Sequence, residues 1–326
     1  MCTAISYRTG DHYFGRNLDL EKSYGEVIAV TPRKYPLQFR KEKTMKQHFA
    51  MIGMAAVVDG YPLYFEAVNE KGVGMAGLNF PGNAVYSEVS ESDGRDQIAV
   101  FEFIPWILSQ SESVEQARRL CERVNLVNIN FSEKMPATPL HWIISDENES
   151  ITVEAVRDGV KIYDNPVGVL TNNPTFDVQM FNLNNYRHLS RTTPKNSFTK
   201  HVPLEIYSRG MGGLGLPGDL SSASRFVKAV FTKENSVCGN GELESISQFF
   251  HILESVYQQR GCVMVAPDQF EITIYSSCIN ASKGVYYYKT YENSQITGVD
   301  MNREDLDGDT VITYALDLEQ KVKMVN

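Results

Sequence analysis

The sequence predicts an α+β fold in which antiparallel sheets carry helices on their outer faces. Its predicted elements follow the order strands, helices, strands, helices, strands along the chain. Most strand-like segments are joined by short connections that contain Gly, Pro or Asn, which is typical of hairpins. A doubly wound parallel sheet would instead alternate single strands with helices. The grouped strands and their short connections therefore favour antiparallel sheets.

The chain begins with a predicted hairpin. The segments CTAISYR (2–8) and HYFGRNLDL (12–20) have strand character and flank the turn residues TGD (9–11). Like them, the other predicted strands are bounded by Gly, Pro, Asn or Asp and are rich in β-branched or aromatic residues. They lie at 26–33, 48–58, 61–68, 72–80, 140–146, 151–156, 167–174, 270–280, 284–293 and 295–301.

Two pairs of helices are predicted from apolar residues at helical spacing. They cover residues 97–110, 113–127, 221–231 and 245–261. Ser113 with Gln116, and Ser245 with Gln248, match the capping-box pattern at the start of a helix. Gly261 supplies a stop signal for the last helix.

The composition is that of an ordinary globular protein, with 42% hydrophobic and 22% charged residues. A net charge of -9 and the lack of a basic run argue against nucleic acid as a partner. A membrane-spanning helix needs about 20 apolar residues. The longest apolar stretch, 49–65, is broken by Asp59, Gly60 and Pro62. The polar start of the chain also lacks the apolar region of a signal peptide, so we expect a cytoplasmic protein without membrane contact.

The cysteines and histidines indicate neither a metal site nor a disulfide framework. The five cysteines are widely spaced and include no C-x-x-C pair, and the six histidines include no H-E-x-x-H motif. The segment GMGGLG (210–215) matches a dinucleotide-binding pattern. However, Pro217 separates it from the next predicted helix, and a flexible loop is the better interpretation. We therefore expect no metal and no cofactor.

Cys2 differs from the other cysteines because it follows the initiator methionine. Removal of Met1 would leave a thiol and a free α-amine on the same residue. Unperturbed thiols and α-amines have pKa values of about 8.5 and about 8, so the amine can accept the proton of the thiol near neutral pH. The sequence thus suggests an amino-terminal nucleophile that needs no histidine as base. The alternative is a structural protein with an incidental cysteine.

The predicted hairpin brings two charged residues to Cys2. A turn centred near Gly10 sets Cys2 across from the neighbourhood of residue 18, which includes Arg16 and Asp19. An arginine would favour the thiolate, and an aspartate could orient the ammonium group. Because the two residues are three apart, an unbroken strand would direct them to opposite faces, so we expect a bulge or a strand end there. The alternative is an edge strand with solvated charges.

Seven segments, spread from residue 1 almost to the end of the chain, match one known family in order and spacing. They are MCTAI, FGRNLDL, YPLYFEAVNEKGVGMAGLNFPG, FEFIPWIL, GVLTNNPTF, GLPGDLSSASRFVKA and YYYKTYENSQITGVDMN. Together they resemble the bile salt hydrolases, also called choloylglycine hydrolases. The resemblance implies a single domain over residues 1–326, with the four-layer αββα sandwich of the amino-terminal nucleophile hydrolases and a mature chain that begins at Cys2. It also implies a homotetramer, with a protruding assembly element at about 185–218.

The resemblance assigns roles to Cys2, Asn79 and Asn172. The Cys2 thiolate would attack the amide carbonyl that joins a bile acid to glycine or taurine. The side-chain amide of Asn172 and the backbone N–H of Asn79 would stabilise the oxyanion, and one such donor can lower the barrier by about 3 kcal/mol. Glycine or taurine would leave first, and water would then cleave the thioester.

Three charged residues complete the catalytic set that the resemblance implies. Asp19 and Arg225 would orient the amine and the nucleophile, and Arg16 would help to keep the thiol ionised. Without the resemblance, Arg225 is an arginine at the start of a predicted helix, where a positive charge is unfavourable for the helix dipole. This placement favours a functional reason for Arg225.

By the same resemblance, the substrate is a conjugated bile salt such as glycocholate or taurocholate, bound in an apolar pocket. The implied pocket residues are Leu18, Tyr24, Phe65, Phe131, Met135 and Leu140. The alternative for these six is a core role. Penicillin V acylase is the alternative activity, although Asn79 favours the bile salt branch, since the acylase branch typically carries an aromatic residue there. A non-catalytic binding protein that retains Met1 is the alternative outside the enzymes.

Overall fold

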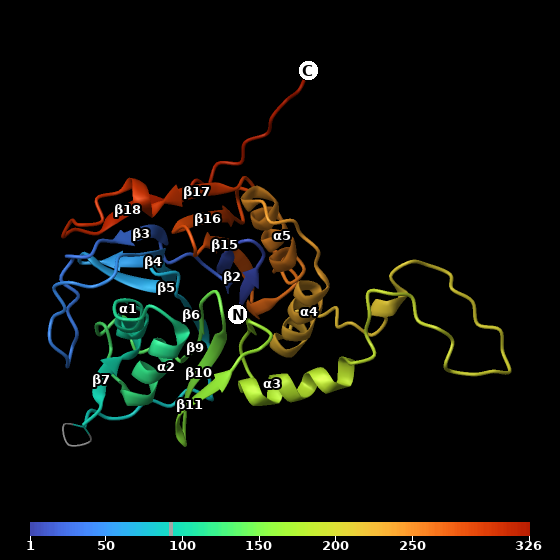
Figure 1. Ribbon diagram of the computed structural model, residues 1–326, viewed down its shortest axis with the longest axis horizontal. Coiled ribbons are helices and arrows are strands. Elements are labelled where there is room, and N and C mark those ends of the chain that lie inside the picture. Colours follow the sequence, from blue (N-terminus) through green and yellow to red (C-terminus); the bar gives the residue numbers. More distant parts are fainter. Residues whose placement is uncertain (91–93) are drawn as a thin grey trace.

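The computed structural model describes residues 1–90 and 94–326. Its centre consists of two antiparallel sheets, which are surrounded by helices (Figure 1). The first is a six-stranded sheet in which the hairpin of β1 and β2 lies near the middle. In spatial order its strands are β12 (Val169–Leu170), β1 (Cys2–Arg8), β2 (His12–Leu20), β15 (Ile272–Asn280), β16 (Val285–Thr290) and β17 (Thr297–Asp300).

The second is an eight-stranded sheet, which the segment near the C-terminus completes by pairing with β3. In spatial order its strands are β11 (Gly159–Asp164), β10 (Ser150–Val156), β9 (Leu140–Ser145), β6 (Gly74–Asn79), β5 (Tyr61–Asn69), β4 (Met51–Val58), β3 (Val27–Thr31) and β18 (Ile312–Ala315). Two small sheets join β7 (Asp96–Ala99) to β8 (Val124–Val127) and β13 (Met264–Ala266) to β14 (Gln269–Phe270).

Helices cover the outer faces of both large sheets. The pair α1 (Phe103–Leu108) and α2 (Val114–Arg123) packs on the eight-stranded sheet, and the pair α4 (Ser222–Asn235) and α5 (Glu242–Glu254) packs on the six-stranded sheet. The remaining helices are α3 (Phe176–Asn182), η1 (Val100–Glu102), η2 (Leu183–Tyr186), η3 (Met211–Gly213) and η4 (Met301–Arg303). The predicted αββα sandwich is confirmed. Among the described residues, no helix is both long enough and apolar enough to cross a bilayer.

Several predicted helix boundaries are wrong. The strands β7 and β8 occupy the start of the first predicted helix and the end of the second, because they pair with each other in parallel. The helix α5 begins at Glu242, with Gly241 as its N-cap, and Ser245 lies inside its first turns, where its Oγ donates to the Gly241 carbonyl at 2.9 Å. The same helix ends at Glu254, so Gly261, with φ of +94°, belongs to a later turn.

Two hydrophobic clusters fill the spaces between the layers. One lies between the two sheets and beneath α4 and α5, and the other lies between the eight-stranded sheet and α1 and α2. Along β9, Ile143 belongs to the first cluster and Trp142 to the second, because successive side chains of a strand point to opposite faces. Each fully buried large apolar side chain contributes roughly 1.5–3 kcal/mol to folding.

A buried polar cluster lies at the turn end of the first hairpin. His12 Nε2 lies 3.1 Å from Ser6 Oγ and 3.2 Å from Ser145 Oγ, and Ser145 Oγ donates to Ser6 Oγ at 2.7 Å. Burial, together with the nearby charge of Arg8, lowers the pKa of His12 to about 4. His12 is therefore neutral in the folded protein at pH values where an unfolded histidine takes up a proton.

This depressed pKa predicts a loss of stability in acid. The unfolded histidine has a pKa of about 6.5, so unfolding is coupled to the uptake of a proton between pH 6.5 and 4. The stability that the buried, neutral His12 contributes above about pH 6.5 is therefore lost as the pH falls. At about 1.4 kcal/mol per pH unit, the loss amounts to about 3 kcal/mol. We expect the difference in free energy of unfolding between wild type and His12→Gln to shrink from pH 7 to pH 4.5. Urea titrations measure it, and a difference that stays constant with pH would contradict the prediction.

The segment 185–218 extends far from both sheets (Figure 1). It is tied at its base, where the Ser190 N–H donates to the Gly212 carbonyl at 2.9 Å. Several large apolar side chains of this segment are exposed, with Phe198 at 90%. The others are Val202, Leu204, Ile206, Tyr207 and Leu214. All of these exposed apolar side chains belong to this one segment of the chain.

Candidate active site

Cys2 is the first residue of β1 and is only 3% exposed. It pairs with Leu18 of β2, and the hairpin register runs without a break from this pair to Arg8 and His12 at the turn. The prediction that Cys2 lies across from residue 18 is confirmed. The unbroken pairing fixes the thiol at the end of a central strand pair, inside the sandwich.

Arg16 and Asp19 lie on opposite faces of β2. The Arg16 guanidinium donates to the carbonyls of Phe65 and Gly77, at 3.1 and 2.6 Å, and therefore points into the space between the sheets. Asp19 points to the helix side, where its carboxylate lies 4.0 Å from Arg225 of α4. Of the bulge or strand end expected here, the β1–β2 register shows the strand end and no bulge. No bulge is needed, because Cys2 is at the strand end and has neighbours on both faces.

The register also determines which group faces which part of Cys2. Since Cys2 pairs with Leu18, and Ala4 with Arg16, the side chains of Cys2 and Arg16 share the face between the sheets. Burial opposes the charge of Arg16, but the neighbouring Cys2, Tyr275 and Glu66 outweigh this cost and raise the pKa of its guanidinium. Arg16 is therefore a permanent cation on the face of the thiol.

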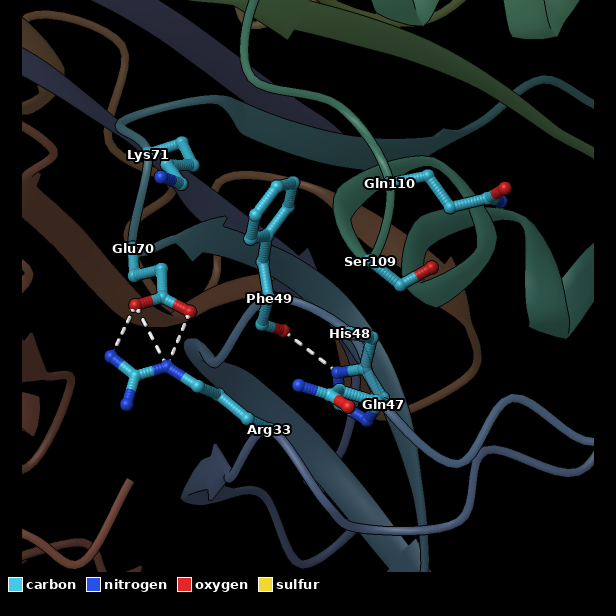
Figure 2. Close-up of a pocket in the computed structure, with 8 residues that line it drawn as sticks. All are labelled: Arg33, Gln47, His48, Phe49, Glu70, Lys71, Ser109 and Gln110. Atoms are coloured by element: carbon cyan, nitrogen blue, oxygen red, sulfur yellow. Dashed lines mark hydrogen bonds and ion pairs between the residues drawn. The ribbon is translucent and has the colours of Figure 1, made fainter. Parts of the chain in front are cut away.

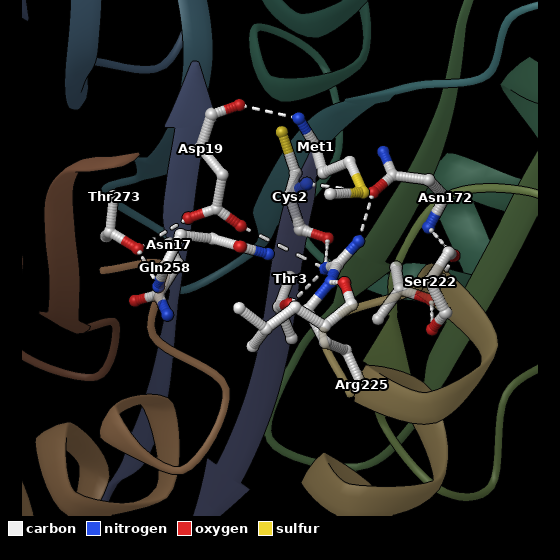
Figure 3. Close-up of polar contacts among 12 residues, drawn as sticks. Met1, Cys2, Thr3, Asn17, Asp19, Asn172, Ser222, Arg225, Gln258 and Thr273 are labelled. Carbon is white, nitrogen blue, oxygen red and sulfur yellow. Dashed lines mark hydrogen bonds and ion pairs between the residues drawn. The ribbon is translucent and has the colours of Figure 1, made fainter. Parts of the chain in front are cut away.

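Arg225 joins the first strand to the helix layer (Figure 3). Its Nη1 donates to the Cys2 carbonyl at 2.5 Å and to Thr3 Oγ1 at 2.7 Å, and its Nη2 donates to Asn172 Oδ1 at 2.8 Å. Burial lowers the pKa of Arg225, while Asp19 and Cys2 oppose this effect. The unfavourable place of this arginine at the start of α4 is explained by these contacts, which position the backbone of Cys2.

Asp19 is buried, and one of its two carboxylate oxygens is without a hydrogen-bond partner. Its Oδ1 accepts from Thr273 Oγ1 at 2.7 Å, whereas Oδ2 has no hydrogen-bond donor among the described residues. Burial raises the pKa of Asp19, opposed by Arg225, the N-terminal amine and the Thr273 hydrogen bond. The charge of Oδ2 is faced by the Arg225 guanidinium, whose Nη1 lies 4.0 Å away.

Asn172 and Asn79 are in direct contact. The Asn172 Nδ2 donates to the Asn79 carbonyl at 2.7 Å, and Asn172 Oδ1 accepts from the Cys2 N–H at 2.8 Å. Ser222 Oγ accepts from the Asn172 N–H at 2.8 Å and fixes the turn after β12. The structure thus brings two residues from different sheets to the amino end of β1.

Met1 continues the pairing of β1 with β2. Its amine donates to the Asp19 carbonyl at 2.6 Å and contacts the Glu271 carboxylate, while the Asp19 N–H donates to the Met1 carbonyl at 3.0 Å. Burial lowers the pKa of the Met1 amine, although Cys2 and Asp19 oppose it. Glu271, which was not predicted from the sequence, thus binds the amine of the first residue.

A second group missing from the sequence prediction lies behind Arg16. Glu66 of β5 is fully buried and accepts from the hydroxyls of Tyr275 and Tyr286, each at 2.6 Å. Arg16 Nε lies 3.9 Å from Glu66 Oε2. Burial raises the pKa of Glu66, while Arg16 and the two tyrosines favour the carboxylate. This cluster connects the two sheets, and the Glu66 carboxylate provides a negative charge beside the Arg16 guanidinium.

Of the six predicted pocket residues, two lie beside this polar centre. Leu18 is paired with Cys2 and is 3% exposed. Phe65 packs at the margin of the cluster between the sheets, and its carbonyl accepts from Arg16. Tyr24, in the loop after β2, is exposed, and Leu140, at the start of β9, packs against the outer cluster. Tyr24 therefore lies at the periphery, whereas Leu140 pairs with Asn79 and directs its side chain to the outer cluster.

Phe131 and Met135 share one loop before β9. The Phe131 N–H donates to the Met135 carbonyl at 3.1 Å. The Phe131 ring lies 5.2 Å from that of Phe101 and 5.9 Å from that of Tyr61, which precedes Phe65 by four residues on β5. This loop thus forms an aromatic group over the start of β5.

A surface pocket of about 500 Å³ lies at the other end of β5 and β6 from Asn79 (Figure 2). It is lined by Arg33, Gln47, His48, Phe49, Glu70, Lys71, Ser109 and Gln110. Arg33 pairs with Glu70 at 2.6 Å, so the principal charges of the pocket neutralise each other. It contains none of the predicted site residues. In the described part of the chain, no three His, Cys, Asp or Glu side chains gather as metal ligands.

The chain matches a known protein family over nearly its whole length. A model of the linear amide C–N hydrolases, choloylglycine hydrolase family, matches residues 2–314. The chain belongs to this family. The resemblance inferred from the sequence is confirmed, and the chain is an enzyme of the class that cleaves linear amide C–N bonds.

Two relatives match the chain over its whole length. It is 56% identical over 326 residues to the bile salt hydrolase/transferase of Lactiplantibacillus plantarum, with both chains covered completely. It is 38% identical to the bile salt hydrolase/transferase of Clostridium perfringens, again with both chains covered completely.

Solved structures give the same fold. A variant of the conjugated bile acid hydrolase of Clostridium perfringens superposes with a TM-score of 0.91 at 38% identity, with 100% of both chains covered. A penicillin V acylase of Agrobacterium tumefaciens gives a TM-score of 0.74 at 19% identity, with 96% of this chain and 91% of the acylase covered. The acylase shares the fold alone.

Proposed function

We propose that this enzyme hydrolyses the amide bond of glycine- and taurine-conjugated bile salts through a thioester on Cys2. The observation that carries the proposal is the 56% identity, over the whole chain, to a protein named bile salt hydrolase/transferase. The geometry of the site supports it. Arg16 shares the face of the thiol, while Asp19 and Arg225 lie on the helix side near the Cys2 backbone.

In the proposed reaction, loss of Met1 frees the α-amine of Cys2, which takes the proton of the Cys2 thiol. The ammonium group then has an acceptor in Asn172 Oδ1, 2.8 Å from Cys2 N, and the buried Asp19 carboxylate supplies a negative charge on the helix side of the same strand pair. Arg16 stabilises the thiolate by its charge. The thiolate attacks the substrate carbonyl carbon, and the electron pair of the C=O bond moves to oxygen.

Two donors are available for the resulting oxyanion. The Asn172 Nδ2 carries a second hydrogen besides the one given to the Asn79 carbonyl. The Phe80 N–H donates to the Pro139 carbonyl beside β9, and since successive N–H groups of a strand point to opposite edges, the Asn79 N–H points away from β9. Asn172 offers a short side-chain donor from the turn after β12, and Asn79 offers a main-chain donor from the end of β6; fixed donors of this kind stabilise an oxyanion.

Collapse of the tetrahedral intermediate breaks the C–N bond, and the Cys2 ammonium gives its proton to the departing nitrogen of glycine or taurine. The amine then takes a proton from water, whose oxygen attacks the thioester. The C–S bond breaks, the free bile acid leaves and the thiolate is restored. Leu18, Phe65 and the loop with Phe131 and Met135 supply apolar surface for the steroid, with Tyr24 and Leu140 at its edge.

The proposal is tested by offering glycocholate, taurocholate and penicillin V separately to the purified enzyme and measuring the released acids and amines by mass spectrometry. We expect rapid release of cholate, with little cleavage of penicillin V. Faster cleavage of penicillin V than of either bile salt would move the enzyme to the acylase branch. That outcome would remove the steroid role of the pocket residues while leaving the role of Cys2 intact.

The names of the relatives support a second activity. The proteins of Lactiplantibacillus plantarum, Clostridium perfringens and Bifidobacterium longum are each named bile salt hydrolase/transferase. The same thioester accounts for both activities, because an amine can replace water as the attacking group. We propose that this enzyme also transfers the bile acyl group to amines when they compete with water.

Replacing Asn172 by alanine is expected to lower kcat for glycocholate about 10²–10³-fold, because it removes a donor aimed at the oxyanion. Steady-state kinetics measure the effect. The matched control is Asn173→Ala, since the neighbouring Asn173 amide donates to the Pro81 carbonyl at 2.7 Å instead. We expect the control to retain kcat within about threefold. An equal loss in both variants would show that the turn, and not the Asn172 donor, is responsible.

We also propose that the enzyme is a homotetramer assembled through the segment 185–218. The proposal is supported by the apolar side chains that this segment exposes, including Ile206 and Tyr207. Light scattering is expected to give the mass of four chains for the wild type and a smaller species for the double variant Ile206→Asp, Tyr207→Asp. The mass of a single chain for the wild type would contradict the proposal.

A further inference from the structure

His141 is a fully buried histidine that the proposed mechanism does not use. It lies on β9, where it pairs with Leu78 of β6, one residue before Asn79. Its neighbour Ile143 belongs to the cluster between the sheets, so the His141 side chain points into the same space. The imidazole therefore lies between the sheets, close to the strand end that carries Asn79.

The first contact of His141 is with the segment of Asn172. His141 Nε2 lies 2.9 Å from the carbonyl oxygen of Thr171, the residue before Asn172. A carbonyl oxygen only accepts, so Nε2 carries the hydrogen of this bond. Ser222 and Gln179 contact the same turn from the side of α4 and α3. His141 fixes it from the eight-stranded sheet.

The second contact is with the segment of Asn79. The ring of Phe80, the next residue, stacks on the imidazole with centroids 4.1 Å apart and planes inclined by 8°. Phe80 is itself fully buried. The same imidazole thus touches the residue that follows Asn79 and the residue that precedes Asn172. These two contacts join the segments that bear the two proposed oxyanion donors.

The third contact fixes the ring itself. His141 Nδ1 lies 3.0 Å from Glu154 Oε1, and the same oxygen accepts from the Phe176 N–H at 3.0 Å. Glu154 is on β10 and is fully buried. A buried carboxylate on one ring nitrogen fixes the orientation of an imidazole, as it does for metal-bound and catalytic histidines. Here the other nitrogen supports a turn of the active site.

We propose that His141, oriented by Glu154, is a positioning residue for the oxyanion site, which sets the distance between the Asn79 N–H and the Asn172 side chain. The inference rests on the proposed function, because it needs an oxyanion between these donors. A displacement of about 1 Å at such a site can cost about 10²-fold in rate. Loss of His141 should therefore weaken oxyanion binding without removing a reacting group.

The test compares His141→Asn with His141→Gln. An asparagine amide replaces Nδ1 and loses the bond to the Thr171 carbonyl, whereas a glutamine amide reaches the position of Nε2 and keeps it. Three quantities are measured: kcat and KM for glycocholate, the affinity of the C24 aldehyde of cholic acid, and the rate of Cys2 alkylation by iodoacetamide. Addition of the Cys2 sulfur to the aldehyde carbon moves the C=O electron pair to oxygen, so the aldehyde reports the oxyanion site without turnover.

We expect His141→Asn to lose about 10–100-fold in kcat and a similar factor in aldehyde affinity. In this variant, KM and the alkylation rate should stay within about twofold of the wild-type values. The His141→Gln variant should retain most of the wild-type kcat and aldehyde affinity. The control is His12→Gln, a change of another buried histidine at the far end of the same sandwich, which should leave kcat and aldehyde affinity unchanged.

Unchanged aldehyde affinity in a folded His141→Asn variant would overturn the proposal, as would an equal loss in the alkylation rate. If His141→Asn does not fold, Phe80→Leu tests the link to Asn79, with a loss of about 3–10-fold expected in kcat and aldehyde affinity. Unchanged values in Phe80→Leu would overturn the link. Failure of the proposed function is seen separately, because the wild type would then neither cleave glycocholate nor bind the aldehyde.

Discussion

Replacing Cys2 by alanine is expected to reduce kcat for conjugated bile salts by at least about 10⁴-fold. The variant keeps the fold but has no nucleophile, and the remaining donors alone provide only a small part of the acceleration. Because Cys2 is 3% exposed and its methyl-sized replacement leaves little empty volume, the temperature of unfolding should change by only a few degrees. Steady-state release of cholate and a thermal scan measure the two effects.

The control for this variant is the exposed Cys262, which the structure places far along the chain in a surface turn. Cys262→Ala should retain full activity. Alkylation should then inactivate the Cys262→Ala protein and the wild type at the same rate. If Cys262→Ala lost activity, or if Cys2→Ala retained more than a few per cent, Cys2 would not be the nucleophile.

Retention of Met1 is expected to abolish hydrolysis although every side chain of the site is present. With Met1 in place, the nitrogen of Cys2 is an amide that cannot accept a proton. The amine of Met1 instead donates to the Asp19 carbonyl and contacts the Glu271 carboxylate. A chain with an N-terminal extension that a site-specific protease removes directly before Cys2 provides the test. We expect activity below about 0.1% of the mature enzyme before cleavage and full activity after it.

The matched control is the same extension cleaved one residue earlier, so that a single methionine remains before Cys2. Intact mass identifies both products. The protein with methionine should stay inactive, which separates the requirement for a free amine from steric obstruction by a long extension. Comparable activity of the two products would show that the α-amine is not the base, and a separate base would then have to be found.

The hairpin and its register were predictable because they depend on local chemistry. A three-residue turn between two alternating strands determines which residues face each other, and Cys2 duly pairs with Leu18. Of the bulge or strand end that was expected near Arg16 and Asp19, the structure has the strand end, with Cys2 as the first residue of β1. Strand geometry does send the two charged residues to opposite faces, and the site uses both, with Arg16 toward the thiol and Asp19 toward α4.

Glu66 could not be predicted, because a bulge changes its direction. In the pairing of β4 and β5, Ala55 faces Tyr64 and Met54 faces Glu66, so Phe65 is an extra residue. Tyr64 therefore packs in the outer cluster while Glu66, two residues later, reaches across to the other sheet. An alternating pattern would have assigned both to one face.

His141 and Glu271 escaped prediction for a different reason. Each acts through contacts with residues distant in sequence: His141 with Thr171, and Glu271 with Met1. A lone histidine or glutamate in a strand-like segment carries no periodic signal, and its partners become visible only when the two sheets are packed. The catalytic set itself came from the resemblance, since TNNP and AGLNF alone indicate only a turn and a strand end.

Hydrolysis through a thioester that is common to all substrates is tested by the partition of this acyl-enzyme between water and hydroxylamine. Glycocholate and taurocholate are each incubated with the enzyme and hydroxylamine, and the ratio of bile acid hydroxamate to free cholate is measured. A common acyl-enzyme has lost its leaving group before water or hydroxylamine attacks, so we expect the same ratio for both substrates. Ratios that differ with the leaving group, or that match those of the uncatalysed mixture, would contradict a thioester on Cys2.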